Sequence, residues 1–339
     1  MADPAAQQRR ALLDRRWIRL GVGLVLSGVA LWLAVRGTHL SEIENALGNA
    51  DWRWLPAMLA IKAGTLAIKD LRWRCELGAM SPGPYRATFR AIGLGYFGNI
   101  VLPFKLGEIL RVGLLRRYNP NVRMGEALAT VAAERALDGA VLAVMVGAVL
   151  NTVNAPGWVM LGTIILLAAM LGVIGLAMLP SVHRFFLDRL PDRGLLGVAR
   201  KVVAALTRGT AVLRQPRAFT AAALLTAVAW LAEAVVFYCA VRALGVSLGF
   251  TSTLVVTLLL SVGLLVPSAP GQIGTHQALC VLFLAPFGVD QLQALSISFV
   301  LQGVALSVLC SIGGFVMVRE AGARELLRRA PSAETSAVD

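Results

Sequence analysis

Long apolar runs divide this chain, and they constrain its fold more than any other feature. Each is close to the roughly 20 residues that an α-helix needs to cross the hydrocarbon core of a bilayer. Hydrophobic residues make up 57% of the sequence and charged residues only 15%, which sets it apart from ordinary soluble domains. We therefore predict an all-α polytopic membrane protein with about six transmembrane helices, at residues 17–36, 54–71, 127–150, 158–179, 218–243 and 290–318.

Positive charge is concentrated in a few segments between these runs. The formal net charge is +13, and 27 of the 32 Lys and Arg residues fall within residues 1–19, 69–123, 181–217 and 319–339. In a soluble protein this excess would favour nucleic acid, but cytoplasmic loops of membrane proteins are also rich in Lys and Arg. We predict a cytoplasmic (inner) membrane location with both termini cytoplasmic, where the basic segments contact anionic lipid headgroups and not nucleic acid.

The same pattern gives the domain organisation. A basic cytoplasmic N-terminus covers residues 1–16, and a cytoplasmic tail covers 319–339. The transmembrane domain between them, 17–318, is predicted to consist of a first half, a basic cytoplasmic linker that lies on the inner membrane surface, and a second half, at residues 17–180, 181–217 and 218–318.

Two further apolar stretches are broken by proline and glycine, and we predict that each is a re-entrant helical hairpin. The first enters near 91–101 and returns near 105–117, with a break at Leu102-Pro103, because proline ends a helix. The second, 252–287, breaks in the sequence VPSAPGQIG. It must enter from the opposite side, because the chain has to be cytoplasmic again by Arg319.

The two breaks resemble each other in sequence. LPFKLGEI at 102–109 and VPSAPGQI at 266–273 share proline, glycine and isoleucine in register. Together with the opposite entry sides, this predicts an inverted pseudo-repeat whose broken helices meet near the bilayer midplane, as in many transporters. The alternative is that both breaks are ordinary packing kinks.

Ionisable residues lie where a bilayer makes them costly. In a helix that begins at residue 127, Glu134 and Asp138 lie about 10 and about 16 Å from its start. A charge at that depth costs at least about 2.5 to 3.5 kcal/mol, so it normally faces a partner or a wet cavity. Arg135 is spaced to pair with Asp138 on one helix face. The alternative to a functional site is a buried ion pair that only orients helices.

Further polar residues surround both breaks, and we predict that they form a track for a lipid headgroup. Arg111, Lys105 and Arg135 would hold a phosphate, since arginine offers a bidentate fork. The acidic residues would balance these cations, bind a cationic headgroup or carry a proton. His276 is a candidate for proton coupling or simply a hydrogen-bonded polar residue. The other polar residues of the track are Asn99, Glu108, Gln272, Thr275 and Gln277.

Charged residues on the second predicted helix form a separate group. Lys69, Asp70 and Arg72 are expected at its cytoplasmic end, where long side chains extend to the membrane surface. Lys62 is deeper and is a candidate for lining the cavity.

Four motifs carry a resemblance to a known family. NIVLPFKLGEILR at 99–111, AERALDG at 133–139, VPSAPGQIGTHQA at 266–278 and FGVD at 287–290 resemble the lysylphosphatidylglycerol synthase transmembrane, or flippase-like, family. The likeness covers roughly 17–318. It implies a membrane protein that moves or modifies envelope lipids, with a site built from Asn99, Pro103, Gly107, Glu108, Arg111, Glu134, Arg135, Asp138, Pro267, Pro270, Gly271, Gly274 and Thr275.

Two positions depart from the family pattern. Gln277 stands where relatives commonly have an acidic or aromatic residue, and Gln302 stands where His or Arg is common. A proton or anion role at these positions is therefore in question for this chain. Relatives that transfer aminoacyl groups carry a soluble domain after the membrane part, whereas this sequence ends at Asp339, so we expect no aminoacyl transfer by this chain alone.

The leading expectation is a lipid flippase or transporter that moves a phospholipid or a polyprenyl-linked lipid. The sequence has no GxxxxGK[ST] motif for ATP, and its four cysteines lack metal-binding spacing, so neither a cofactor nor a metal is expected. One alternative is a membrane-embedded transferase that acts on a lipid-linked substrate, with Asp138 or Glu108 as base. Another is a non-catalytic partner of an envelope-lipid enzyme. A homodimer fits any of these.

Overall fold

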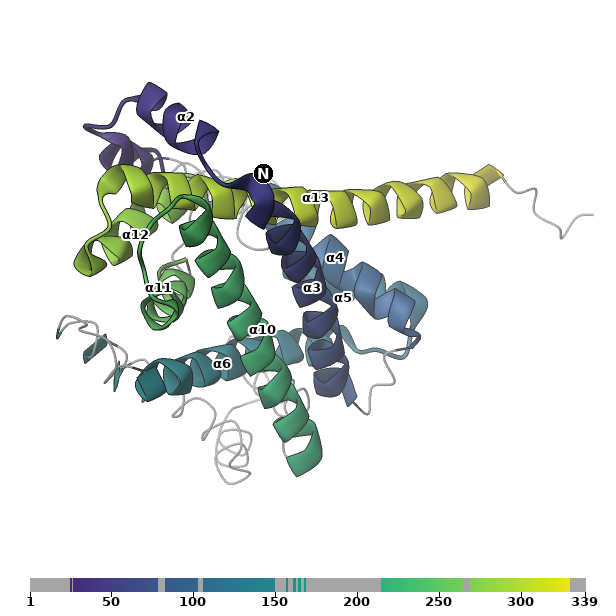
Figure 1. The fold of residues 1–339 in the computed structure, drawn as a ribbon. Helices are drawn as coiled ribbons and strands as arrows, with labels where there is room; N and C mark the ends of the chain where they lie inside the picture. The colour runs from purple at the N-terminus through teal and green to yellow at the C-terminus, as the bar shows by residue number, and fades with distance from the viewer. Residues whose placement is uncertain are drawn as a thin grey trace, which may run out of the picture.

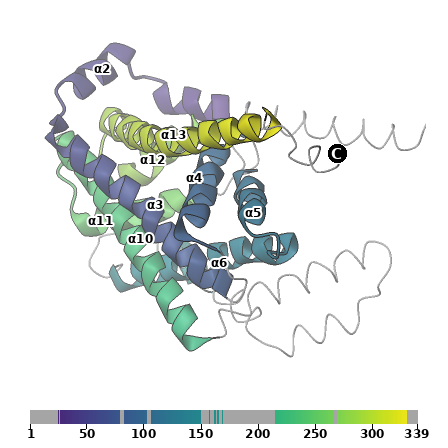
Figure 2. The ribbon, with the colours of Figure 1, turned by 90° about the vertical axis from the view of Figure 1, so that its right-hand side faces the viewer.

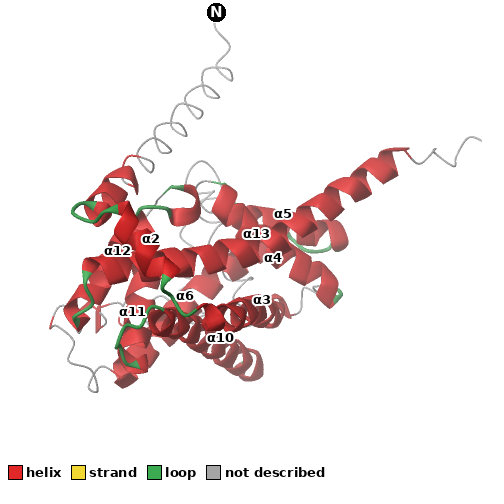
Figure 3. Ribbon diagram, turned by 45° about the horizontal axis from the view of Figure 1, so that its top comes forward, coloured by secondary structure: helices red, strands yellow, loops and turns green. Residues whose placement is uncertain are grey.

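The computed structural model describes residues 27–78, 83–102, 106–149, 215–264 and 269–329, with isolated positions at 25, 157, 161, 162, 164, 165 and 168. In this part of the chain all regular elements are helices and no strand occurs (Figure 3). In chain order they are α2 (Leu40–Gly48), η1 (Trp52–Trp54), α3 (Leu55–Leu77), α4 (Tyr85–Val101), α5 (Gly107–Tyr118), α6 (Met124–Val149), α10 (Pro216–Ala243), α11 (Phe250–Gly263), η6 (Pro270–Gln272), α12 (Thr275–Leu284), η7 (Ala285–Phe287) and α13 (Gln291–Arg329).

Four predicted apolar spans are confirmed as helices, namely α3, α6, α10 and α13. Among the described residues, α10 and the Gln291–Glu320 part of α13 are long and apolar enough to cross a membrane. The described end of the first predicted span is helical at residues 27–35. The fourth span, 158–179, and nearly all of the linker lie outside the described residues.

Helices α3 and α10 pack side by side, α13 crosses them near one end, and α6 lies toward the other (Figures 1 and 2). Apolar side chains fill two main clusters between these helices. One contains Met58 and Phe237 and joins α3 and α10 to α11, α12 and α13. The other contains Trp73, Ile92 and Val112 and joins α3 to α4, α5 and α6. Each broken hairpin is therefore anchored in its own apolar cluster.

The first hairpin is confirmed as two packed helices with a break at the predicted place. Helix α4 ends at Val101 and α5 begins at Gly107, while Pro103 and Lys105 in the break lie outside the described residues. Glycine allows the two helices to touch: a Cβ on Gly107 would lie 1.9 Å from the carbonyl oxygen of Gly95. Because real Cβ atoms never come so close, this contact needs glycine.

The second hairpin consists of α11 and α12 with the short helix η6 between them. Gly271 and Gly274 have positive φ angles of 69° and 87°, in a region that favours glycine. Helix α4 of the first hairpin contacts η6, so the break of one hairpin lies against a helix of the other. Contact between the hairpins is what the predicted repeat requires, whereas its inverted orientation in a bilayer remains a prediction.

Candidate functional site: two charged clusters between the hairpins

Glu134 is the centre of a buried ionic network. It lies on α6 with its side chain 1% exposed, and guanidinium groups from three different positions approach its carboxylate. Arg72 of α3 donates to Oε1 at 2.7 Å, and Arg111 of α5 donates to Oε2 at 2.8 Å. Arg135 reaches Oε1 at 3.3 Å. The neighbouring charges stabilise an ion that would be costly among apolar helices.

Asp138 lies one helical turn after Glu134 and extends the network toward α10. Arg72 Nη1 donates to Asp138 Oδ1, which also accepts a hydrogen bond from the indole Nε1 of Trp230 at 3.2 Å. The predicted pairing with Arg135 is present at 3.4 Å. Arg72 therefore holds two carboxylates of α6 at once, which a planar guanidinium fork allows.

Arg111 is sealed inside the protein. Its side chain is buried, Nε lies 2.7 Å from Glu108 Oε2, and the guanidinium carbon lies 4.8 Å from the centre of the Trp73 ring. Trp73 is fixed in turn, because its Nε1 donates to the hydroxyl of Thr130 at 3.0 Å. In this arrangement Arg111 faces two carboxylates, and its predicted contact with a phosphate requires one of them to move.

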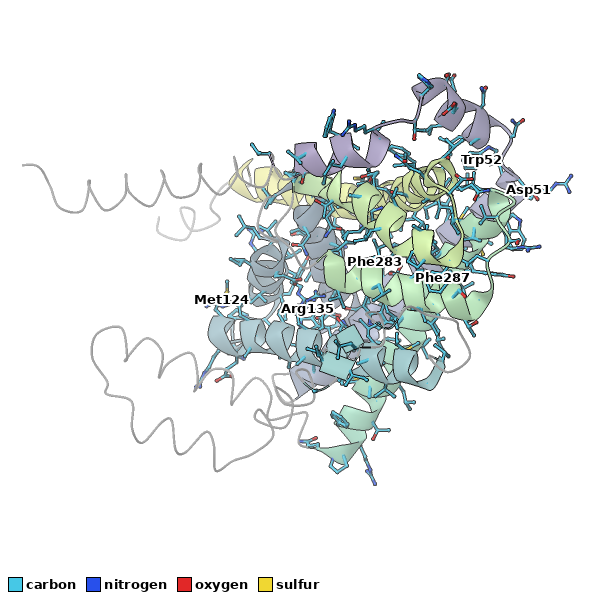
Figure 4. The ribbon with its side chains drawn as sticks, turned by 90° about the vertical axis from the view of Figure 1, so that its left-hand side faces the viewer. Asp51, Trp52, Met124, Arg135, Phe283 and Phe287 are labelled. Carbon is cyan, nitrogen blue, oxygen red and sulfur yellow. The ribbon has the colours of Figure 1, made fainter. Side chains whose placement is uncertain are left out.

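Glu108 and Arg135 form the outer edge of the network. Their side chains are 16% and 42% exposed, and Arg135 Nη2 donates to Glu108 Oε1 at 2.9 Å. Figure 4 labels Arg135 on α6. Asn99 Nδ2 donates to the same oxygen at 3.4 Å. The network thus runs from a sealed centre to an accessible end on α6.

Arg72 and Asp70 correct the sequence prediction, which placed them at a membrane surface. Both are buried, at 1% and 0% exposure, so that prediction is wrong. Asp70 accepts a hydrogen bond from Thr88 at 3.1 Å, and Glu76 lies 3.7 Å from Arg72. The physical reason is that carboxylates of α6 compensate Arg72, so its charge is more stable inside. We call Arg72, Arg111 and Arg135, with Glu76, Glu108, Glu134 and Asp138, the arginine network.

The break of the second hairpin is held by two glutamine side chains. Gln302 of α13 donates from Nε2 to the carbonyl oxygen of Gly271 at 2.7 Å and accepts from Gln277 Nε2 at 2.6 Å. Gln277 Oε1 accepts from the backbone N–H of Gly274 at 2.7 Å. Gln277 and Gln302 are thus hydrogen-bonded to each other and fix the loop that contains Pro270 and Gln272. The φ angle of Gln272 is 59°.

Residues next to this break also contact distant elements. His276 Nδ1 lies 2.8 Å from the hydroxyl of Ser298 on α13. The backbone N–H of Ala269 donates to Ser27 Oγ at 2.8 Å, and Ser27 Oγ lies 3.3 Å from Thr275 Oγ1. Pro267 lies outside the described residues. The tip of the second hairpin is therefore attached to both the helical segment 27–35 and helix α13.

A second charged cluster lies between α3 and α10. Lys62 and Lys69 donate to the two oxygens of Glu233 at 2.7 and 3.0 Å. We call these three residues together the lysine pair. The Lys69 ammonium lies 5.0 Å from the centre of the Tyr96 ring on α4. Ile61, the neighbour of Lys62 on α3, packs against the apolar cluster that contains Cys280 of α12. This cluster therefore lies between the two hairpins.

The structure separates the predicted site residues into two groups. Asn99, Gly107, Glu108, Arg111, Glu134, Arg135 and Asp138 lie in or beside the arginine network, and Pro270, Gly271, Gln272, Gly274, Thr275, His276 and Gln302 surround the second break. Among the described residues no hydrogen bond or ion pair joins the two groups directly; the lysine pair lies beside both.

Sequence reasoning missed Glu233, Trp230 and the role of Arg72. Glu233 had a signal, because it is the one acidic residue in the apolar run 218–243. Trp230 had none, since tryptophan is common in membrane helices. No group of three or more His, Cys, Asp or Glu side chains within the described ranges is arranged to hold a metal ion.

Comparison with known proteins agrees with the predicted resemblance. A family model described as "Lysylphosphatidylglycerol synthase TM region" matches residues 20–314. A "UPF0104 membrane protein" from Methanothermobacter thermautotrophicus is 24% identical over 310 residues, which cover 86% of this chain and 89% of that protein. The matched residues include both broken hairpins and both charged clusters.

Proposed function

Because this chain belongs to the lysylphosphatidylglycerol synthase TM region family of membrane proteins, we propose that it is a lipid flippase or transporter. It would move a phospholipid or a polyprenyl-linked lipid across the cytoplasmic membrane, with both termini in the cytoplasm. The observation that carries the proposal is the graded exposure of the arginine network, from the sealed Arg111 to the accessible Arg135.

Lipid flipping has one main physical obstacle, which is moving a polar headgroup through hydrocarbon. A protein lowers that barrier by offering polar partners along a path while the acyl chains stay in the lipid. The outer edge formed by Arg135 and Glu108 offers a guanidinium and a carboxylate within 2.9 Å of each other. A headgroup phosphate can replace Glu108 as the partner of Arg135, because its oxygens can accept the N–H group that Glu108 Oε1 accepts here.

Distances indicate that Arg135 is the cation free to change partners. Its contacts to Glu134 and Asp138 measure 3.3 and 3.4 Å, longer than a typical charge-assisted hydrogen bond. Arg72 and Arg111 hold Glu134 more closely, at 2.7 and 2.8 Å. If Arg135 turns toward a lipid, Glu134 keeps two guanidinium partners, so no buried carboxylate is left without compensation.

The test is lipid scrambling in proteoliposomes with fluorescent phospholipid and polyprenyl-linked probes. Arg135→Ala removes the exchangeable cation, and we expect scrambling to fall by about 10-fold or more, the loss expected for one charge-assisted contact. Glu108→Gln keeps the shape and removes the competing charge. The matched control is Arg123→Ala, which removes an exposed arginine that also has an i,i+3 carboxylate partner, Glu126.

Clear outcomes follow from this comparison. Loss of scrambling in Arg135→Ala with full activity in Arg123→Ala supports the proposed path. Full scrambling in both Arg135→Ala and Glu108→Gln, in protein that is folded by gel filtration, would remove the arginine network from the mechanism. No scrambling of any lipid by the unmodified protein would reject transport itself.

A further inference from the structure

Taken by itself, the lysine pair carries more positive charge than its one carboxylate balances. Lys62 and Lys69 share the carboxylate of Glu233, and this arrangement of two ammonium groups and one carboxylate has a net charge of +1. The three side chains are only 15 to 18% exposed. An unbalanced charge at such a place is costly in a membrane protein and normally has a partner.

The two ammonium groups also have more N–H donors than Glu233 has oxygens to accept them. An ammonium group has three N–H donors. Within the part of the chain that the structure describes, each lysine donates to one oxygen of Glu233 and to no other acceptor. Two donors per ammonium are therefore available to a further acceptor, and the ring of Tyr96 beside Lys69 provides a surface that favours cations.

We propose that the lysine pair binds the phosphate of a lipid phosphodiester, a headgroup with one negative charge. A phosphodiester monoanion cancels the +1 charge, and its oxygens accept the available N–H donors of both lysines. A polyprenyl diphosphate would leave the site with excess negative charge inside apolar helices, so the charge balance selects against it. Of the two lipid classes open for the proposed transport, the site therefore favours a phospholipid.

The location of the pair fits a binding step within the proposed transport, on which this inference rests. Tyr96 belongs to the first hairpin, and Ile61, the neighbour of Lys62 on α3, packs against the apolar cluster that contains Cys280 of α12 in the second. A phosphate held between α3 and α10 would thus lie next to both hairpins. The arginine network cannot take this role without first losing a carboxylate contact, because its sealed guanidinium groups face carboxylates.

The experiment measures lipid binding to the purified full chain by native mass spectrometry. Phosphatidylglycerol tests the monoanionic diester, phosphatidylcholine the zwitterion, a polyprenyl diphosphate the more highly charged group, and inorganic phosphate the headgroup without acyl chains. We expect phosphatidylglycerol to bind most tightly. Lys62→Met and Lys69→Met should each weaken it by about 10- to 100-fold, the loss of one charged hydrogen bond.

Changing Glu233 gives the opposite sign and guards against simple misfolding. Glu233→Gln raises the charge of the site from +1 to +2, so it should bind phosphatidylglycerol at least as well and should now accept the diphosphate. The double variant Lys62→Met with Glu233→Gln returns the charge to +1 and should recover part of the binding that Lys62→Met loses. Arg53→Met, at an exposed position, is the control and should change nothing.

Two results would overturn the inference. One is unchanged phosphatidylglycerol binding in both lysine variants; the other is tighter binding of the diphosphate or of inorganic phosphate to the unmodified protein. The failures of the two proposals are distinguishable. If the protein scrambles lipid and neither lysine variant changes lipid binding, this binding site is rejected and the transport proposal stands. If lipid binding depends on the lysines but no lipid is scrambled, the transport proposal is rejected and the binding site stands.

Discussion

The arginine network and the lysine pair both include charged residues of α3, but they balance charge in different ways. In the network, three guanidinium groups face four carboxyl groups, and the contacts of Glu134 with Arg72 and Arg111 measure 2.7 and 2.8 Å. In the lysine pair, two ammonium groups share one carboxylate. The first cluster has no surplus of cations, while the second has one.

This difference separates a structural role from a binding role. Arginine has a rigid, planar fork that connects fixed partners, whereas lysine carries a point charge on a flexible stem that can change partners at low cost. We therefore expect mutations in the centre of the arginine network to act mainly on stability. Mutations in the lysine pair should act mainly on ligand binding.

The largest effect is expected for Arg72→Met. It leaves Glu134 and Asp138 with one fewer buried cation, and breaking a buried pair in this way costs about 3 to 5 kcal/mol. We expect a large fall in the midpoint of thermal unfolding, measured in detergent by fluorescence-detected gel filtration. A midpoint equal to that of the unmodified protein would erase the distinction between the two clusters.

Gly107→Ala comes next and tests whether the first hairpin positions the network. The new Cβ would lie 1.9 Å from the carbonyl oxygen of Gly95, so α4 and α5 must separate. Overpacking of this kind costs about 1 to 3 kcal/mol. Since Glu108 and Arg111 follow on α5, scrambling should fall with stability. Gly113→Ala, a position with open space on the same helix, is the control.

Gln302→Leu tests the second break and should cost somewhat less. It removes the donor to Gly271 and leaves the amide of Gln277 without its acceptor, a loss of about 1 to 2 kcal/mol. The expected readout is a modest fall in unfolding temperature with faster limited proteolysis near residues 269–274. Gln302→Glu retains an acceptor for Gln277 but places a carboxyl oxygen against the carbonyl oxygen of Gly271, so it should lose at least as much, and unchanged stability in both variants would refute this account.

The smallest stability effect is expected for Lys62→Met. Lys69 keeps its contact with Glu233, so the carboxylate is not left unpaired, and removing the surplus buried charge offsets the lost hydrogen bond; the free energy of unfolding should therefore change by less than about 1 kcal/mol. The comparison is sharpest when Arg72→Met and Lys62→Met are measured side by side. A Lys62→Met variant as unstable as Arg72→Met would make the lysine pair a structural element as well.

Much of the helical organisation could be predicted, because it follows from local patterns. Apolar runs near 20 residues identified α3, α6, α10 and α13, and Pro-Gly breaks identified both hairpins. The pairing of Arg135 with Asp138 was accessible because it lies within one helical turn. The grouping of Glu108 and Arg111 with residues of α6 followed from the polar residues around the first break and from the family motifs.

Contacts between distant helices could not be predicted. Arg72 meets Asp138 across 66 positions of sequence, and Glu233 meets Lys62 across 171. Which face of α3 turns inward depends on the packing of α6 and α10, and α3 itself carries charged residues on more than one side. The sequence therefore showed that charges lie in apolar helices, but not how they are paired.

The attachment of Ser27 to the second break has a consequence for how the chain is made. A Cβ on Gly274 would lie 2.1 Å from the carbonyl oxygen of Ser27, so the two segments are in direct backbone contact. At about 5 to 20 residues per second, a ribosome takes roughly 12 to 50 s to travel from one to the other. The helical segment 27–35 is therefore synthesised well before its contact partner, and this contact can form only after the last third of the polypeptide has been partly made.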